Sequence, residues 1–295
     1  MKPSLKTSLN EKTSVMRHIQ LPDGENIPKL GLGTWYMGEQ KSRLEREAAA
    51  VRYAMERGIR LIDTAEMYGN GGAEEVVGAA IASAAIPRED IFIVSKVLPS
   101  NAHHDDAIRA CERSLARLGT GYIDMYLLHW RGAAPFSETI EAFEELQSAG
   151  KIRHFGVSNF DTRDMEEWLY CKGGKALACN QILYNLSRRG PEWDMLPFCR
   201  NHGVPVMAYS PLEQGRLQGD PVLARIAARY GVSDLQIALA WVLAQDNVIA
   251  IPKAVNHAHI DQNLAALDIQ LDTEDHALLN AAYAPPDGPS HLEML

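Results

Sequence analysis

The chain has 295 residues, of which 46% are hydrophobic and 23% charged, the ordinary balance of a globular protein. Its formal net charge of −9 argues against general binding to nucleic acids or anionic membranes, but leaves room for a local basic pocket that holds a phosphate. No apolar stretch approaches the roughly 20 residues that span a bilayer, and the first residues, MKPSLKTSLNEKTS, lack the apolar segment of a secretory signal. We therefore expect a cytoplasmic protein that begins with a flexible tail over residues 1–14.

The cysteines indicate neither a zinc site nor a disulfide framework. None of them forms a CxxC pair, and their spacing is irregular: Cys111, Cys171, Cys179 and Cys199. The adjacent His103 and His104 have no cysteine or carboxylate at a spacing that completes a set of metal ligands. We expect reduced, mostly structural thiols and no metal site.

Beyond the tail, the sequence predicts a hairpin and then eight buried strands. The Pro-Asp-Gly turn in MRHIQLPDGENIPKL (16–30) joins two short extended runs, which is typical of a β-hairpin. Short apolar runs then recur along the chain, and each is typical of a strand buried on both faces. These runs cover residues 29–34, 61–65, 91–96, 123–129, 154–159, 178–184, 204–210 and 248–253.

Helical patterns separate the strands. In segment 105–118 the apolar residues recur every three or four positions, which places them on one helix face. Segments 73–86, 138–149 and 233–245 have similar patterns, and a glycine stands where each of four helices should end: Gly58, Gly119, Gly150 and Gly231. Eight strand–helix units without a linker predict one domain over residues 15–295, an α/β fold of the (β/α)8 TIM-barrel type with an N-terminal β-hairpin and a C-terminal helix and tail.

An open, doubly wound sheet is the competing fold, and the sequence does not favour it. Its dinucleotide-binding fingerprint is G-x-G-x-x-G between a strand and a helix. The segment GLGTWY (31–36) supplies two glycines, but Tyr36 stands at the position of the third, and no helical pattern follows directly.

Polar side chains end several predicted strands. Asp63, Lys96 and His129 end the second, third and fourth strands, and Tyr68 follows Asp63 by five residues. Lysine is almost never fully buried without a partner. We therefore expect a partner for Lys96, which ends the segment IFIVSK (91–96). In a parallel barrel all strand carboxyl ends meet on one rim, where such enzymes place their chemistry. The sequence therefore predicts a site on this rim.

The motifs at these strand ends resemble those of the aldo-keto reductase family. In chain order they are GLGTW (31–35), LIDTAEMY (61–68), VSK (94–96), LLHW (127–130), GVSNF (156–160), NQILYN (180–185), YSPL (209–212) and IPK (251–253). The segments TWYMG, TAEMYGNGGAE and LLHW further resemble a bacterial branch that includes methylglyoxal reductases. The resemblance implies reduction of aldehydes, small or reactive ones such as methylglyoxal and possibly some ketones, by hydride transfer from NADPH.

The resemblance also implies a catalytic tetrad of Asp63, Tyr68, Lys96 and His129. A phenol has a pKa near 10, which makes it a weak acid at neutral pH. We expect Lys96 to lower the pKa of Tyr68, the proton donor, and Asp63 to keep Lys96 charged and oriented. His129 would donate a hydrogen bond to the substrate oxygen.

By the same resemblance, the dinucleotide lies extended across the barrel mouth. The predicted cofactor-binding residues are Gly33, Thr34, Trp35, Asp63, Ser158, Asn159, Gln181, Tyr209, Ser210, Leu212, Gln214, Lys253, Ala254, His259, Gln262 and Asn263. Ser158, Asn159 and Gln181 would hold the carboxamide, and Tyr209 would stack on the nicotinamide. The substrate pocket would include Trp35, Tyr68, His129 and Trp130.

One departure from the family pattern bears on the choice of cofactor. The family commonly follows IPK with serine or threonine and then an arginine that clamps the 2′-phosphate, whereas this chain has Ala254 and His259 there. A neutral imidazole holds phosphate less well than a guanidinium. Lys253 remains, so we expect NADPH, with NADH possible.

Three alternatives use the same rim. An NADPH-binding regulatory or sensor subunit would turn over slowly, and a Schiff-base aldolase would need a lowered pKa for Lys96, which a nearby Asp63 opposes. A metal hydrolase would need a cluster of histidines, which the predicted rim lacks. We expect a small-molecule carbonyl substrate, no nucleic-acid or membrane partner, and a monomer or at most a weak oligomer.

Overall fold

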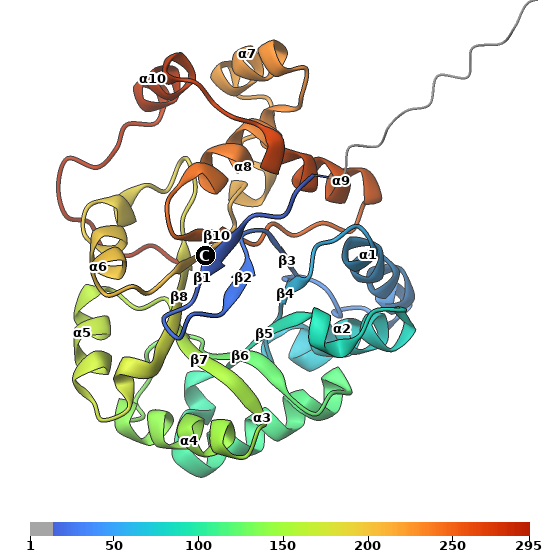
Figure 1. Cartoon of the computed structure of the whole chain (residues 1–295), viewed down its shortest axis with the longest axis vertical. Coiled ribbons are helices and arrows are strands. Elements are labelled where there is room, and N and C mark those ends of the chain that lie inside the picture. Colours follow the sequence, from blue (N-terminus) through green and yellow to red (C-terminus); the bar gives the residue numbers. More distant parts are fainter. Residues whose placement is uncertain (1–13) are drawn as a thin grey trace, which may run out of the picture.

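The computed structural model describes residues 14–295, so the predicted tail, except for Ser14, lies outside the described residues. Eight parallel strands surround a central axis and helices cover the outside of this ring (Figure 1). The strands are β3 (Gly31–Gly33), β4 (Leu61–Asp63), β5 (Phe92–Val97), β6 (Ile123–Leu128), β7 (Ile152–Ser158), β8 (Leu177–Leu183), β9 (Val206–Tyr209) and β10 (Val248–Ala250). All eight predicted strands are confirmed.

The strands pair in chain order and the ends of the sheet meet. Each strand from β3 to β10 is hydrogen-bonded in parallel to the next. Parallel bridges from Leu30 to Ala250 and from Gly33 to Lys253 join the first strand to the last. The (β/α)8 barrel is therefore confirmed, with all strand carboxyl ends on one rim.

The helices match the predicted patterns where these were made. The helices are α1 (Leu44–Glu56), α2 (Gly72–Ser83), α3 (His104–Leu118), α4 (Phe136–Ser148), α5 (Thr162–Tyr170), α6 (Met195–Asn201), α7 (Pro221–Tyr230), α8 (Asp234–Ala244), α9 (His257–Ala265) and α10 (Thr273–Ala282). The four predicted helical segments, 73–86, 105–118, 138–149 and 233–245, correspond to α2, α3, α4 and α8. Gly119 and Gly231 end α3 and α7 in the left-handed conformation that favours glycine. Among residues 14–295, no helix combines the length and apolar content needed to cross a membrane.

The barrel has two hydrophobic cores. The larger one lies between the strands and the helices, and the smaller one fills the inside of the barrel. The smaller core includes Ile19, Leu21 and Ile27 of the N-terminal hairpin, formed by β1 (His18–Gln20) and β2 (Asn26–Pro28). The predicted hairpin is thus confirmed, and its apolar residues plug the end of the barrel opposite the polar rim.

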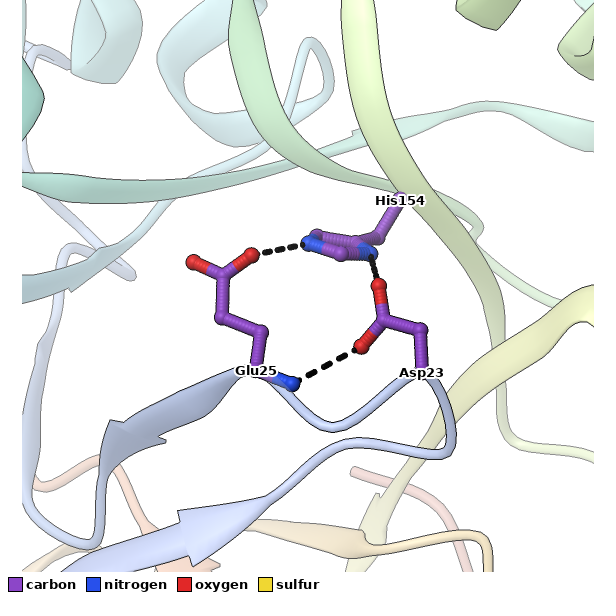
Figure 2. A group of neighbouring side chains, drawn as sticks. All are labelled: Asp23, Glu25 and His154. Carbon is purple, nitrogen blue, oxygen red and sulfur yellow. Dashed lines mark hydrogen bonds and ion pairs between the residues drawn. The ribbon is translucent and has the colours of Figure 1, made fainter.

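Charged side chains fasten the hairpin to the barrel (Figure 2). His154 of β7 lies between two carboxylates of the hairpin turn, with its Nε2 2.8 Å from Glu25 Oε2 and its Nδ1 3.3 Å from Asp23 Oδ2. Arg153 also donates to Glu25, at 2.6 Å. The two carboxylates face opposite nitrogens of the ring, and a guanidinium adjoins one of them. The group is therefore arranged as a brace between hairpin and barrel rather than as ligands around one ion.

All four cysteines carry free thiols, as the sequence predicted. Cys111 and Cys199 are buried, and burial raises the pKa of each thiol to about 12. Thiols in this state are poor nucleophiles, which fits a structural role.

Candidate active site

Strand alternation explains why the predicted residues point into the barrel. Along a strand, every second side chain faces the same side. Phe92 and Val94 of β5 belong to the inner core, so Lys96, two positions further on, also points inward at the rim. On β4, Leu61 also belongs to the inner core, and Asp63, two positions further on, therefore points inward as well. The apolar part of each strand thus places the polar residue that follows it.

Lys96 is completely buried, and the hydrogen-bond partners of its ammonium are all oxygens. Its ammonium lies 2.8 and 2.9 Å from the two carboxylate oxygens of Asp63, 2.8 Å from the backbone carbonyl of Thr64, and 3.2 Å from the hydroxyl of Tyr68. Gln181 donates a further hydrogen bond to Asp63, at 2.7 Å. This pattern fits an ionised pair, because an ammonium offers only donors and the carboxylate is bonded only to donors.

Burial acts against both charges of this pair. It raises the pKa of Asp63 and lowers the pKa of Lys96, while the attraction and hydrogen bonds between the two groups act in the opposite direction. The predicted partner of Lys96 is therefore present, and the pair compensates a desolvation cost that either charge alone would bear in full.

Contrary to the expectation, the pKa of Tyr68 is not lowered overall, although the Lys96 ammonium adjoins its hydroxyl. The pKa of Tyr68 is raised well above its ordinary value of 10, first by burial and then by the negative charge of Asp63. The ammonium, 3.2 Å away, does not offset these effects. Tyr68 is consequently a protonated phenol at neutral pH. Because its oxygen accepts a hydrogen bond from Lys96, its own proton is available to another acceptor.

His129 lies beside Tyr68 as a neutral imidazole. The two ring centroids are 5.7 Å apart. Burial and then the charge of Lys96 lower the pKa of His129 to about 2. Its Nδ1 is buried and has no hydrogen-bond partner among residues 14–295. A neutral imidazole carries one proton, and when that proton is on Nε2 this atom is a hydrogen-bond donor.

A cavity of about 730 Å³ opens on this rim and contains most of the predicted site residues. The buried residues Asp63, Tyr68 and His129 line it, and Trp35 and Trp130 also line it. Trp35 packs edge-on against Tyr68, with ring centroids 4.7 Å apart. Lys96 does not line the cavity, but its ammonium contacts the lining residues Tyr68 and Asp63.

Polar groups beside the tetrad form a connected set. Asn159 donates to the backbone carbonyl of His129 at 3.1 Å and accepts a hydrogen bond from the Tyr209 hydroxyl at 3.0 Å. The Ser158 hydroxyl donates to the Gln181 carbonyl at 2.9 Å. These residues line the cavity on strands β7, β8 and β9. Their side chains are held at fixed positions before any ligand is bound, as a site for a flat amide-bearing ring requires.

The loop after β9 has an unusual backbone. Ser210, Glu213 and Gln214 have φ values of 47°, 47° and 55°, in the left-handed region that non-glycine residues seldom occupy. Ser210, Leu212 and Gln214 line the cavity, whereas the Glu213 side chain is buried away from it and bonded to Arg188 and Asn185. Such conformations persist where surrounding contacts hold them, and they concentrate at ligand sites.

The far end of the cavity carries the cationic and amide groups predicted for the adenosine end. Lys253, His259, Gln262 and Asn263 all line it. Lys253 and His259 are exposed, whereas Asn263 is buried on α9. Lys253 supplies an ammonium group to this part of the cavity lining.

Besides Lys96, two predicted residues lie outside the cavity lining, and several lining residues were not predicted. Thr34 is buried and donates to the backbone carbonyl of Asp63 at 2.9 Å, and Ala254 is buried. The predicted site did not include the lining residues Tyr36, Met67, Pro211, Gly215, Gln218, Ser233, Asp234, Leu235, Gln236, Ile251, Pro252, Met294 and Leu295. Most of these belong to loops or to the chain end, which have no periodic pattern to mark them.

Comparison with known proteins agrees with this geometry. The family model described as "Aldo/keto reductase family" matches residues 29–284. Methylglyoxal reductase YeaE of Escherichia coli is 49% identical over 282 residues, which cover 94% of this chain and 98% of that protein. Glyoxal reductase of Bacillus subtilis is 35% identical over 284 residues, which cover 96% of this chain and 99% of that protein.

Solved structures show the same likeness. An aldo-keto reductase from Klebsiella pneumoniae, crystallised in complex with NADPH, is 47% identical and superposes with a TM-score of 0.91, covering 95% of this chain and 100% of that one. The same identity, TM-score and coverage hold for an aldo/keto reductase from Klebsiella pneumoniae in complex with NADP and acetate. With the match over residues 29–284, these relatives place the protein in a family of oxidoreductases: the chain belongs to the aldo/keto reductase family.

Proposed function

We propose that this protein reduces small aldehydes to alcohols with NADPH, and that Tyr68 donates the proton. The observation that carries the proposal is the contact of the buried Lys96 ammonium with both Asp63 and the hydroxyl of Tyr68, two residues that line the cavity. A phenol so placed offers its proton to the cavity. The likeness to reductases of methylglyoxal and glyoxal supports small, reactive aldehydes as substrates.

The residues of the cavity fit a nicotinamide dinucleotide. Asn159 and Gln181 present amide groups, Tyr209 presents an aromatic ring, and Lys253 lies at the opposite end, where a phosphate would need a cation. In our proposal Ser158, Asn159 and Gln181 hold the carboxamide, and the Ser210–Gln214 segment follows the pyrophosphate. The Klebsiella pneumoniae structures with NADP and NADPH support the same choice of cofactor.

Each of the four residues Asp63, Tyr68, Lys96 and His129 has its own role in the proposed reaction. NADPH, when bound, supplies the hydride that forms the new carbon–hydrogen bond. His129 donates a hydrogen bond from Nε2 to the carbonyl oxygen and polarises the carbonyl group. Tyr68 transfers its proton to that oxygen as negative charge develops there, and Lys96 stabilises the resulting phenolate. Asp63 keeps the ammonium charged and oriented.

An aldehyde panel tests this function. Loss of NADPH absorbance is followed with methylglyoxal, glyoxal and larger aldehydes as substrates, and tight NADPH binding is measured separately by fluorescence. We expect multiple turnovers with the small aldehydes. Tight binding of NADPH with only a single slow turnover on every aldehyde would instead support the sensor-subunit alternative.

The raised pKa of Tyr68 predicts a difference between the two directions of the reaction. Reduction needs the protonated phenol, which persists well above neutral pH, so kcat for reduction should change little between about pH 6 and pH 9. Oxidation of the alcohol needs the phenolate, so its rate should rise with pH over the same interval. Both profiles are measured with the wild-type protein, and a reduction rate that falls steeply from pH 6 to pH 8 would contradict Tyr68 as the acid.

The basic residues of the cavity lining predict how strongly the protein prefers one cofactor over the other. In our proposal Lys253 and His259 face the 2′-phosphate, and an imidazole holds phosphate less well than a guanidinium. The variant His259→Arg should therefore strengthen the preference for NADPH over NADH, which is measured as the ratio of the two Kd values. An unchanged ratio in this variant would remove position 259 from this role.

We further propose a single domain over residues 15–295 that acts as a monomer in the cytoplasm. The free thiols of all four cysteines fit a reducing compartment.

A further inference from the structure

The C-terminal segment ends at the cavity. After α10 the chain crosses back over the barrel, and its end projects onto the barrel centre (Figure 1). Met294 and Leu295 line the cavity and are about half exposed, at 51% and 50%. Leu292 packs against the outer hydrophobic core. The last two residues therefore form part of the cavity wall, and Leu292 is the nearest apolar anchor behind them.

Arg188 connects this segment to the loop after β9. Its Nη1 donates to Glu293 at 2.6 Å, and its Nη2 donates to Glu213 at 2.9 Å. Glu293 directly precedes the wall residues Met294 and Leu295. Glu213 lies between Leu212 and Gln214, which line the same cavity. One guanidinium thus bridges two carboxylates that belong to two walls of one site.

The two halves of the bridge differ in strength. The Glu213 side chain is 6% exposed and also accepts hydrogen bonds from Asn185, at 2.8 Å, and Arg216, at 3.2 Å. The Glu293 side chain is 50% exposed, so solvent screens its pair with Arg188. Glu213 therefore holds Arg188 firmly, whereas Glu293 can leave and return. Formation or loss of the pair between Arg188 and Glu293 can therefore dock or release the residues that follow, Met294 and Leu295.

We propose that Arg188 is a positioning residue that couples the C-terminal wall of the substrate pocket to the cofactor loop. This inference rests on the proposed function, in which the Ser210–Gln214 segment follows the pyrophosphate of NADPH. Contacts between NADPH and this loop would order it and so restrict the position of Glu213. Because Glu213 holds Arg188, the guanidinium would then stay where it can bind Glu293. NADPH therefore favours the docked C-terminal wall, and by linkage the docked wall raises the affinity for NADPH by the same factor.

The direct test measures the C-terminal segment itself. Hydrogen exchange of a peptide covering residues 286–295 is followed by mass spectrometry with and without NADPH, in the absence of aldehyde. In the wild type, NADPH should slow exchange of this peptide. In Glu293→Gln, which keeps the size of the side chain but removes its charge, this protection should be lost, and Kd for NADPH should rise by about two- to fivefold, the range of an exposed ion pair.

Matched variants separate the coupling from a general effect on the loop. Arg188→Gln should also abolish the protection, while Asn185 and Arg216 keep Glu213 partnered, so the fold should persist. Arg216→Gln removes another guanidinium from Glu213 without touching Glu293, and it should retain the protection. Equal protection in the wild type, Arg188→Gln and Glu293→Gln would overturn the coupling.

Steady-state kinetics give a second readout. Releasing the wall should raise KM for small aldehydes with little change in kcat, because the wall contributes binding rather than chemistry. Release of the C-terminal wall should also reduce the difference in KM between small and bulky aldehydes. In a protein lacking residues 294 and 295, Glu293→Gln should have no further effect on KM, since the bridge acts only through these residues. A full additional effect there would contradict the proposal.

The two proposals fail in distinguishable ways. If fluorescence titration shows no binding of NADPH to the wild type, the proposed function fails and the coupling fails with it. If NADPH binds and aldehydes are reduced, but exchange over residues 286–295 is unchanged by NADPH, only the coupling is overturned.

Discussion

Replacement of Tyr68 by phenylalanine is expected to lower kcat for aldehyde reduction by about 10²- to 10⁴-fold, the usual contribution of a positioned general acid. The variant removes the hydroxyl that lies 3.2 Å from Lys96 and leaves the ring that packs against Trp35. Kd for NADPH, measured by fluorescence, should change little, because the phenol acts on the substrate oxygen. Steady-state kinetics with methylglyoxal measure the loss.

The matched control removes a different buried hydroxyl. Tyr126 lies on β6 within the outer core, away from the cavity, and Tyr126→Phe should keep kcat within about twofold of the wild type. A Tyr68→Phe protein that turns over at near wild-type rate would exclude Tyr68 as the proton donor, whatever the identity of the aldehyde.

Replacement of Lys96 by methionine should damage both catalysis and stability. Without the ammonium, the phenolate that forms on Tyr68 has no cation beside it, so kcat should fall by about 10²-fold or more while Kd for NADPH changes little. The buried carboxylate of Asp63 also loses its partner, which should cost about 3–5 kcal/mol of the free energy of unfolding. Denaturant unfolding and steady-state kinetics measure the two effects separately.

A second substitution separates these two roles of Lys96. The double variant Asp63→Asn with Lys96→Met removes both charges, so it should recover most of the lost stability. It should not recover kcat, because no cation is restored next to Tyr68. Recovery of both properties together would mean that Lys96 serves only to neutralise Asp63.

The local elements of this protein followed from its sequence. Apolar runs such as IFIVSK predicted buried parallel strands, and the three- and four-residue spacing in 105–118 predicted α3, because these patterns reflect which faces of a strand or helix are buried. Glycines at 119 and 231 marked helix ends because the left-handed conformation found there favours glycine. The rim position of Lys96 also followed, since strand polarity and alternation are local properties.

The contacts between distant segments did not follow from local pattern. Gln181 and Asp63 are 118 positions apart, and Arg188 and Glu293 are 105 apart, yet each pair is hydrogen-bonded. The wall residues Met294 and Leu295 carried no motif that would have marked them. Barrel closure and the path of the C-terminal segment bring these groups together, and both depend on packing across the whole chain.

For Tyr68, the sequence determined the position of the phenol and the tertiary structure decided its protonation state. The sequence by itself determined which groups stand on the rim, namely an acid, an ammonium, an imidazole and a phenol, because strand periodicity and order along the chain are encoded locally. It led to the wrong direction for the pKa of Tyr68, which rises through burial and through Asp63. Only the tertiary structure decided that balance, because the cost of burying a charge and the strength of its neighbours depend on depth and distance in the folded barrel.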